Sequence, residues 1–237
     1  MISLNDKTPI LTGASHGIGR AIALRLAREK VRLAICGRDA QALEQVASEA
    51  STIASAKVFW KSFELTCEEA VIGFYLAARE HFGTPDILIN NAGFNSRKAP
   101  LGEMTTEEFD DIIAVNLKAP FVLLREAIRG MIERRSGHIV NILSTVCQFA
   151  NEGMSIYTAA KKGLEGLSGV LLKEARPHGV RVSAVYPGGT DTSFRSKPRP
   201  DYMKPESVAE AVYAVLSMPE DLVVHGITFR PMVETNF

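Results

Sequence analysis

Short, almost wholly apolar runs alternate along the chain with longer segments in which apolar residues recur every three or four positions. The short runs indicate buried strands, and the periodic segments indicate amphipathic helices. We expect strands near residues 8–12, 31–36, 57–61, 86–90, 137–143, 180–186 and 226–230. We expect helices near residues 17–29, 39–50, 67–81, 106–134, 154–176 and 205–217. This alternation predicts an α/β fold with one doubly wound sheet of about seven mainly parallel strands and helices on both faces.

Prolines modify this picture at three places. Pro9 is expected to be the first paired residue of its strand, because a proline further inside would remove a hydrogen-bond donor from the sheet. Pro120 is expected to weaken the hydrogen bonding of the long helix over 106–134 and to kink it. Residues 189–205 are rich in proline and basic side chains and lack apolar periodicity, which predicts a surface loop or lid.

Length and charge narrow the class of protein. The chain has 237 residues with 27 basic and 27 acidic side chains, so its formal charge is zero. That length suits a single domain over residues 1–237, and the balanced charge gives no electrostatic case for a nucleic acid or an anionic membrane as partner. Residues 1–7 lack the features of a signal peptide, and no uncharged apolar stretch approaches the ~18 residues of a membrane-spanning helix.

The three cysteines, Cys36, Cys67 and Cys147, are widely separated and show no metal-ligand spacing. We therefore expect no metal site and a reducing cytoplasm as the setting. Cys147 is expected to be a packing or pocket-lining residue rather than a nucleophile.

A glycine-rich turn, residues 12–19 (TGASHGIG), joins the first expected strand to the first expected helix. Strand, glycine turn and helix form the context of a Rossmann-type dinucleotide site, where glycines let the backbone approach the pyrophosphate and the helix N-terminus faces it. The spacing G-x-x-x-G-x-G differs from the usual G-x-G-x-x-G, and a plain strand-to-helix turn is the alternative. The candidate cofactor contacts in this turn are Gly13, Ser15, His16, Gly17, Ile18 and Gly19.

Tyr157 and Lys161 lie four residues apart in a segment expected to be helical, so their side chains share one face. A phenol titrates near ~10, and a fixed cation beside it lowers that pKa toward neutral pH. The phenol can then deliver a proton to a forming alkoxide or take one from an alcohol. By itself the spacing is common on helices, and an interfacial tyrosine with an exposed lysine is the alternative.

Further motifs follow in order, and together with this pair they make the chain resemble the classical short-chain dehydrogenase/reductase family from about residue 7 to about residue 192. The turn at 12–19 is similar to that family's nucleotide turn, and the interval from Ser144 to Tyr157 is typical of the family. The other matching positions are Asn90, Asn91, Ala92, Gly93, Asn116, Lys161, Pro187 and Gly188. The resemblance implies a Rossmann-type fold and a homotetramer or homodimer.

The resemblance also implies an NADP-dependent oxidoreductase that moves hydride reversibly between the nicotinamide and a carbonyl or secondary alcohol. Tyr157 would exchange the proton, Ser144 would hydrogen-bond the substrate oxygen, and Lys161 would lower the Tyr157 pKa and bind the ribose. Asn116, the fourth member of this tetrad, would orient a water that links Lys161 to solvent. A Ser144 that only caps a turn and an Asn116 bonded only to backbone are the alternatives. Implied cofactor contacts are Asn90, Ala92, Gly93, Tyr157, Lys161, Pro187, Gly188, Thr190 and Thr192.

The end of the second expected strand bears on the choice of nicotinamide cofactor. Gly37 stands where NAD-preferring members of the family carry aspartate, and Arg38 can pair with a 2′-phosphate. His16 stands where many NADP-preferring members have arginine or lysine, and Glu64 where the family usually has an aspartate near the adenine. We therefore expect NADP(H) rather than NAD(H). A solvated Arg38, with Asp39 only capping the next helix, is the alternative.

The substrate is expected to be a small-molecule carbonyl or alcohol from one of two branches. One branch is a small polar ketone or alcohol. The other is a 3-oxoacyl thioester of acyl carrier protein or CoA, for which Arg129 and Lys173 would offer basic contacts to an acidic carrier. The ending Arg230-Pro231-Met232, where many acyl reductases have Asp-Gly-Gly, disfavours this second branch. A non-catalytic NADP-sensing protein is a further alternative.

Pocket residues are expected near the tetrad or in the substrate loop over 189–205. The candidates are Phe94, Asn95, Arg97, Thr145, Cys147, Gln148, Met154, Phe194, Arg195 and Tyr202. The basic residues Arg195, Lys197 and Arg199 of that loop would either attract an anionic substrate or simply be solvated.

Overall fold

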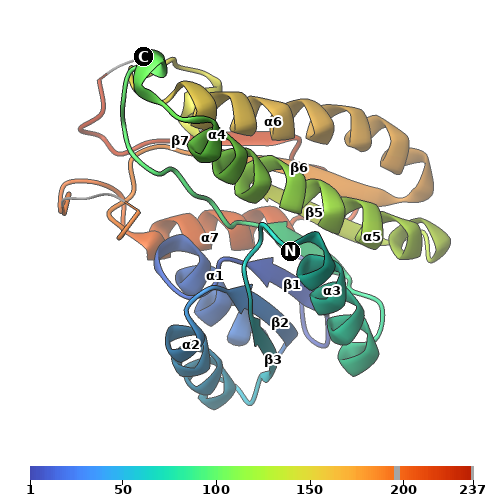
Figure 1. The fold of residues 1–237 in the computed structure, drawn as a ribbon. Helices are drawn as coiled ribbons and strands as arrows, with labels where there is room; N and C mark the ends of the chain where they lie inside the picture. The colour runs from blue at the N-terminus through green and yellow to red at the C-terminus, as the bar shows by residue number, and fades with distance from the viewer. Residues whose placement is uncertain (195–197, 236–237) are drawn as a thin grey trace.

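The computed structural model describes residues 1–194 and 198–235. In these residues, seven strands form one sheet in the order β3-β2-β1-β4-β5-β6-β7, and every neighbouring pair is parallel (Figure 1). The strands are β1 (Pro9–Thr12), β2 (Arg32–Gly37), β3 (Lys57–Ser62), β4 (Ile87–Asn90), β5 (Gly137–Ile142), β6 (Val180–Pro187) and β7 (Gly226–Phe229). The predicted doubly wound α/β fold is confirmed, with each strand close to its expected range.

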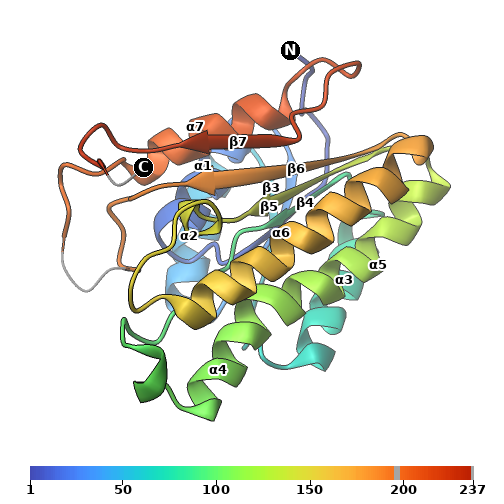
Figure 2. The same cartoon turned by 90° about the horizontal axis from the view of Figure 1, so that it is seen from above.

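Helices cover both faces of the sheet, with α1, α2 and α7 on one face and α3, α5 and α6 on the other (Figures 1 and 2). The helices are α1 (Gly17–Ala27), α2 (Ala40–Thr52), α3 (Glu68–Phe82), α4 (Thr106–Ile113), α5 (Ala119–Glu133), α6 (Ser155–Ala175) and α7 (Pro205–Leu216). Short 3₁₀ turns, η1 (Leu101–Glu103), η3 (Thr145–Cys147) and η4 (Arg176–His178), were not expected from the sequence. Among the residues described, no helix has both the length and the apolar character needed to cross a membrane.

The strands read as continuous apolar runs because helices bury both faces of the sheet. Successive residues of β1 point to opposite faces, so Ile10 packs in the cluster with α3 and α5 whereas Leu11 packs in the cluster with α1 and α7. Leu88 and Ile89 of β4 divide in the same way. These four side chains are fully buried, which gives the sheet a rigid centre beneath the site.

Pro9 is the first residue of the central strand β1 and pairs with Ile87 of β4. The preceding residue, Thr8, donates its backbone N–H to the Asp86 carboxylate at 2.9 Å. The missing donor of Pro9 therefore falls at the end of the ladder, as the sequence predicts.

The helix expected over 106–134 is present without a break up to Glu133, but a π-helix that was not expected, η2 (Ala114–Lys118), joins α4 to α5. The Ala119 N–H donates to the Ala114 carbonyl five residues back, which is the π-helical pattern. Pro120 has no N–H to offer, and the side-chain amide of Asn116 donates to the Ile112 carbonyl at 2.8 Å. The weakened helical hydrogen bonding that was predicted near Pro120 is therefore present, in the form of a π-helical turn.

The strand order reverses between β1 and β4, and ligands of doubly wound sheets bind outside the carboxyl ends of the strands at such a point. β1 ends at Thr12, β4 at Asn90, β5 at Ile142 and β6 at Pro187. The glycine turn, residues 90–93, Ser144 and Gly188 lie at or just after these four ends, whereas Asn116 lies in η2 and the Tyr157–Lys161 pair lies on α6. The fold thus brings segments that are far apart in the chain to one edge of the sheet.

Candidate active site

The glycine turn after β1 packs too closely for side chains. Gly13 has φ +68°, and a Cβ there would lie 2.8 Å from the Ala92 Cα atom. A Cβ on Gly19 would overlap the Gly13 carbonyl oxygen and lie 2.5 Å from Asn91 Nδ2. Glycine at both positions lets α1 begin directly against the segment that follows β4.

Thr12 and Asn91 join the ends of β1 and β4. Both belong to the sequence motifs, but neither was predicted to be a site residue. The Thr12 hydroxyl accepts the N–H groups of Asn91 and Ala92 at 3.1 and 3.0 Å. The Asn91 side chain donates to the carbonyls of Thr12 and Gly13 at 2.9 and 3.2 Å. A polar residue at the end of each apolar strand was the available sequence signal. These bonds set the spacing between the two predicted cofactor segments.

The N-terminus of α1 fits the phosphates of a dinucleotide. In the described part of the chain, His16 makes no side-chain capping bond to α1, and the first turn of the helix has no acidic residue. The first amide groups of a helix lack internal acceptors and carry partial positive charge. The Ser15 hydroxyl beside them is buried and finds no hydrogen-bond partner among the described residues. Phosphate or ribose oxygens would satisfy these donors.

The end of β2 lies beside this turn. A Cβ on Gly37 would collide with the Ser15 hydroxyl oxygen, so an aspartate would not fit there without a shift. Asp39 caps α2 by accepting the Ala42 N–H at 3.0 Å and lies 3.1 Å from His16 Nε2. The Ala42 N–H and then the His16 contact hold the pKa of Asp39 below its ordinary value. Its neighbour Arg38 is exposed at the rim of this turn.

The Arg38 guanidinium carbon lies 5.7 Å from the centre of the Phe94 ring. Phe94 follows β4. The Arg38 side chain therefore extends from the end of β2 toward the second predicted cofactor segment, residues 90–93. Glu64, the predicted adenine neighbour, is exposed after β3. Both charged side chains are thus exposed, as a contact to the predicted nucleotide requires.

Tyr157 and Lys161 lie one turn apart on α6, and both are buried, with exposed fractions of 7% and 2%. The Lys161 ammonium lies 5.8 Å from the centre of the Tyr157 ring and donates to the Ile142 carbonyl at the end of β5, at 2.9 Å. Burial lowers the pKa of Lys161 to about 8. The structure therefore places a desolvated ammonium close to the Tyr157 ring, as the predicted tetrad requires.

Asn116 is fully buried in the π-helix, and its side chain is used by the backbone. It accepts the Phe94 N–H at 3.2 Å and donates to the Phe94 carbonyl at 2.7 Å. A Cβ on Gly93 would lie 3.5 Å from Asn116 Oδ1 and 3.8 Å from Lys161 Nζ, so these three residues meet. The backbone contacts that were the alternative for the Asn116 side chain are therefore present, and the role of Asn116 toward a water stays a prediction.

Ser144 follows β5, and its hydroxyl accepts the Val146 N–H at 3.3 Å at the start of η3. This is the capping role that was the alternative to catalysis. A hydroxyl can accept this bond and still donate its own hydrogen, so the two roles are compatible. Beyond it, the rings of Tyr157 and Phe194 lie 5.8 Å apart, which brings the substrate loop to the tetrad.

The remaining predicted cofactor residues divide between the crevice and the core. A Cβ on Gly17 would lie 3.0 Å from Thr192 Cγ2, so the segment after β6 reaches the glycine turn. Thr190 is buried and donates its hydroxyl to the Gly188 carbonyl at 3.2 Å. Asn90 instead donates its side-chain amide to Asn141 within the sheet, at 2.8 Å, a structural contact.

Only some of the candidate residues for the substrate pocket lie close to Tyr157. Met154 and Phe94 share an apolar cluster with Tyr157, whereas Arg97 is held by Glu108 of α4 at 2.9 Å. Gln148 donates to Thr228 of β7. Arg195 and Lys197 lie outside the residues that the structure describes, so the proposed attraction of an anion by this loop stays a prediction.

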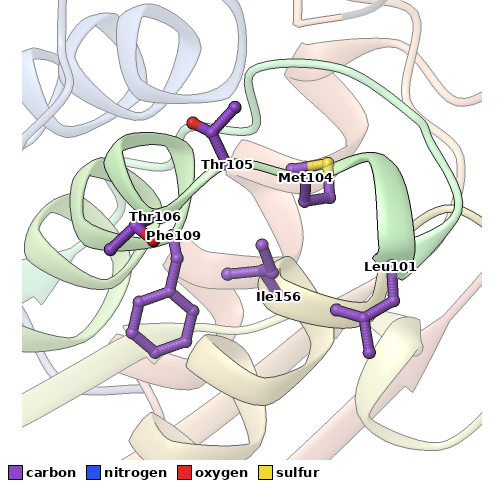
Figure 3. Close-up of a pocket in the computed structure, with 6 residues that line it drawn as sticks. All are labelled: Leu101, Met104, Thr105, Thr106, Phe109 and Ile156. Atoms are coloured by element: carbon purple, nitrogen blue, oxygen red, sulfur yellow. The ribbon is translucent and has the colours of Figure 1, made fainter.

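A hollow of about 270 Å³ lies apart from the tetrad, between η1, the start of α4 and α6 (Figure 3). Its lining residues are Leu101, Met104, Thr105, Thr106, Phe109 and Ile156. Ile156 precedes Tyr157 in the chain, yet no tetrad residue lines this hollow within the described structure. It is therefore distinct from the predicted substrate pocket.

The Cys147 thiol and the side chains that can ligate metals are the other chemical groups of interest in the sequence. Burial raises the pKa of the Cys147 thiol to about 11, which keeps it protonated and poorly nucleophilic. Across residues 1–194 and 198–235, no group of three or more His, Cys, Asp or Glu side chains could hold a metal ion.

The parallel sheet, the glycine turn and the open N-terminus of α1 are typical of the Rossmann-type class of protein. A family model described as short chain dehydrogenase matches residues 7–203. An uncharacterized oxidoreductase of Staphylococcus aureus strain MW2 is 34% identical over 235 residues, which cover 98% of this chain and 100% of that protein. The chain belongs to the short-chain dehydrogenase family and is an oxidoreductase of that family.

Solved structures agree with this assignment. An alcohol dehydrogenase from the archaeon Thermococcus sibiricus, complexed with 5-hydroxy-NADP, has a TM-score of 0.90 and 30% identity, covering 98% of this chain and 99% of that chain. A metagenomic short-chain oxidoreductase in complex with NADP has a TM-score of 0.88 and 33% identity, covering 98% of this chain and 100% of that chain. Both similar proteins thus carry NADP or a derivative of it.

Proposed function

We propose that this protein is an NADP-dependent oxidoreductase that transfers hydride reversibly between the nicotinamide and a carbonyl or secondary alcohol. The observation that carries the proposal is the buried Lys161, fixed by the Ile142 carbonyl one turn from Tyr157. A buried ammonium is costly, and a protein keeps one where its charge is used. The single domain over residues 1–237 would contain both the cofactor site and the catalytic tetrad.

The bound cofactor supplies the hydride, and this chain's residues handle the substrate oxygen and its proton. In the reductive direction, Tyr157 donates its proton to the oxygen as negative charge grows there. The Ser144 hydroxyl donates a hydrogen bond to the same oxygen, an interaction typically worth roughly 3 kcal/mol in the transition state. Lys161 lowers the Tyr157 pKa through its charge, and the Asn116 carbonyl holds a water that returns the proton.

The dinucleotide would lie along the crevice from the end of β2 to the end of β6. Its pyrophosphate would contact the turn at 12–19. Its adenosine half would contact Arg38, His16 and Glu64. Its nicotinamide half would contact the segments at 90–93 and 187–192. The Ser15 hydroxyl and the N-terminus of α1 support this placement, because neither has a side-chain partner among the described residues. The NADP complexes of the two similar structures support the choice of cofactor.

Replacing Arg38 by leucine is expected to raise the KM for NADPH about ten- to hundredfold and to leave the KM for NADH nearly unchanged, because only the 2′-phosphate loses a charge-assisted partner. Steady-state kinetics with both cofactors measure the change. Arg28→Leu is the matched control, since Arg28 is another exposed arginine, at the far end of α1. Equal effects on NADPH and NADH would show that Arg38 does not read the 2′-phosphate.

We propose a small polar ketone or alcohol as substrate, with a 3-oxoacyl thioester as the alternative. The ending after β7 supports the first branch, because it is Arg230-Pro231-Met232 where many acyl reductases have Asp-Gly-Gly. NADPH consumption with acetoacetyl-CoA and with a panel of small hydroxyketones and diketones tests the choice. We expect faster turnover with the panel, and a preference for acetoacetyl-CoA would reverse the order.

We also propose that the protein forms a homodimer or homotetramer through α5 and α6. Phe121 on α5 is 42% exposed, and Leu167 and Val170 on α6 are 37% and 58% exposed. Large apolar side chains on two adjacent helices are typical of a surface that a second copy covers.

A further inference from the structure

The chain after β7 contains an ion pair at the base of the substrate loop. Arg230 Nε lies 3.1 Å from Glu234 Oε2, and the two side chains are only 10% and 13% exposed. The second carboxylate oxygen of Glu234 accepts the Gly189 N–H, also at 3.1 Å. Glu234 therefore joins the last described residues of the chain to the turn that follows β6.

The pair leaves little room around this turn. A Cβ on Gly188 would lie 2.7 Å from Glu234 Oε2 and 3.0 Å from Arg230 Cγ, and a Cβ on Gly189 would collide with the Tyr202 ring. The backbone of Gly188 is fixed as well, since its N–H donates to the Phe229 carbonyl at 2.8 Å. The turn is thus held between β7, the ion pair and the returning end of the substrate loop.

This turn leads directly to the predicted nicotinamide contacts. Thr190 is bridged to Met203, whose N–H donates to the Gly189 carbonyl at 3.2 Å. Two residues further on, Thr192 packs against Gly17 of the glycine turn. A shift of Gly189 would therefore displace Thr190 and Thr192 from the cofactor crevice.

The other side of the ion pair touches the segment after Ser144. The Arg230 guanidinium carbon lies 4.8 Å from the centre of the Phe149 ring. Gln148 donates to the Thr228 hydroxyl at 2.6 Å, on the strand that leads into Arg230. The pair thus packs between the segment that carries the substrate-binding serine and the segment that carries the nicotinamide contacts.

We propose that Arg230 and Glu234 are positioning residues that hold residues 188–192 in the shape that binds the nicotinamide half of the cofactor. This inference rests on the proposed function, because it requires a nicotinamide cofactor in the crevice. The pair takes no part in proton or hydride transfer. NADPH and NADH share the nicotinamide half, so losing the pair weakens both to the same extent, unlike the loss of Arg38.

The test replaces Glu234 by glutamine, which keeps an acceptor for the Gly189 N–H but removes the charge opposite Arg230. We expect the Kd of NADPH and the Kd of NADH, measured by nucleotide fluorescence without substrate, each to rise about tenfold. At saturating NADPH, kcat should stay close to that of the unaltered protein. Glu29→Gln is the matched control, because Arg25 of α1 and Glu29, which follows the end of that helix, form a similarly spaced, partly buried pair. It should change neither Kd.

Unchanged Kd values in Glu234→Gln would overturn the proposal, even if the melting temperature fell, since the pair would then only stabilise the fold. If that variant does not fold, Arg230→Gln, which removes the other charge of the pair, replaces it, with the same expected rise in both Kd values. A rise for NADPH alone would also overturn the proposal, because it would place the effect at the 2′-phosphate. If the unaltered protein binds neither nucleotide, the proposed function itself fails, and this result is distinct from the other two.

Discussion

Replacing Tyr157 by phenylalanine is expected to lower kcat by a factor of about 10²–10⁴ and to leave the affinity for NADPH nearly unchanged. The substitution keeps a ring that is buried beside Met154 and Phe94, and it removes only the hydroxyl. Without that hydroxyl, the alkoxide formed by hydride addition has no acid beside it. Turnover with the best ketone of the panel and fluorescence of bound NADPH measure the two quantities separately.

The matched control for this variant is Tyr75→Phe. Tyr75 is also a buried tyrosine, 2% exposed, but it lies on α3 within the core and away from the tetrad. Turnover of the control should stay close to that of the unaltered protein. Near-normal turnover in Tyr157→Phe would remove Tyr157 as the proton donor and would favour the non-catalytic NADP-sensing alternative.

The sheet could be predicted from the sequence because its strands are buried on both faces. Such strands appear as unbroken apolar runs, and glycines or polar residues such as Thr12 and Asn90 mark their carboxyl ends. Parallel strands place those ends at one edge, so the sequence alone was enough to assign motifs that are far apart in the chain to one site. Pro9 could be placed for a similarly local reason, its missing N–H.

The π-helix between α4 and α5 could not be predicted from apolar periodicity. A single π-turn shifts the apolar stripe by a fraction of a turn, and the pattern over 106–134 still resembles one helix. The π-helix is accompanied by a tertiary contact, since the Asn116 amide bonds to the Phe94 backbone as well as to Ile112. Only Pro120 gave a local sign of the disturbance.

Candidate site residues could be predicted where they belong to a local sequence motif. Contacts between segments that are distant in sequence could not be predicted. The glycines of the turn and the Tyr157–Lys161 spacing are local patterns. The bond between Glu234 and Gly189 joins residues that are far apart in sequence, and a single glutamate near the chain end carries no pattern. The capping role of Asp39 was foreseen only as part of the alternative for Arg38, and its contact with His16 depends on where the ends of β1 and β2 meet.

Replacing Lys161 by methionine is expected to reduce kcat/KM for NADPH-dependent reduction by a factor of about 10²–10⁴, because Tyr157 loses its cation and the ribose loses a donor. Lys162→Met is the matched control. Lys162 is the next residue on α6, but its side chain is 53% exposed and pairs with Glu165 at the surface. Steady-state kinetics should show near-normal activity for the control.

The same substitution is expected to stabilise the cofactor-free protein. Burial lowers the Lys161 pKa from 10.5 to about 8, which corresponds to a penalty of about 3 kcal/mol for the charged ammonium at neutral pH. Methionine removes that penalty and loses about 1 kcal/mol from the bond to the Ile142 carbonyl, so unfolding should cost about 2 kcal/mol more. Between pH 8 and 10.5 the folded chain releases a proton that the unfolded chain keeps, so the unaltered protein gains stability there. Urea unfolding from pH 7 to 10 should therefore show an advantage that shrinks above pH 8, and a constant difference would contradict the buried charge.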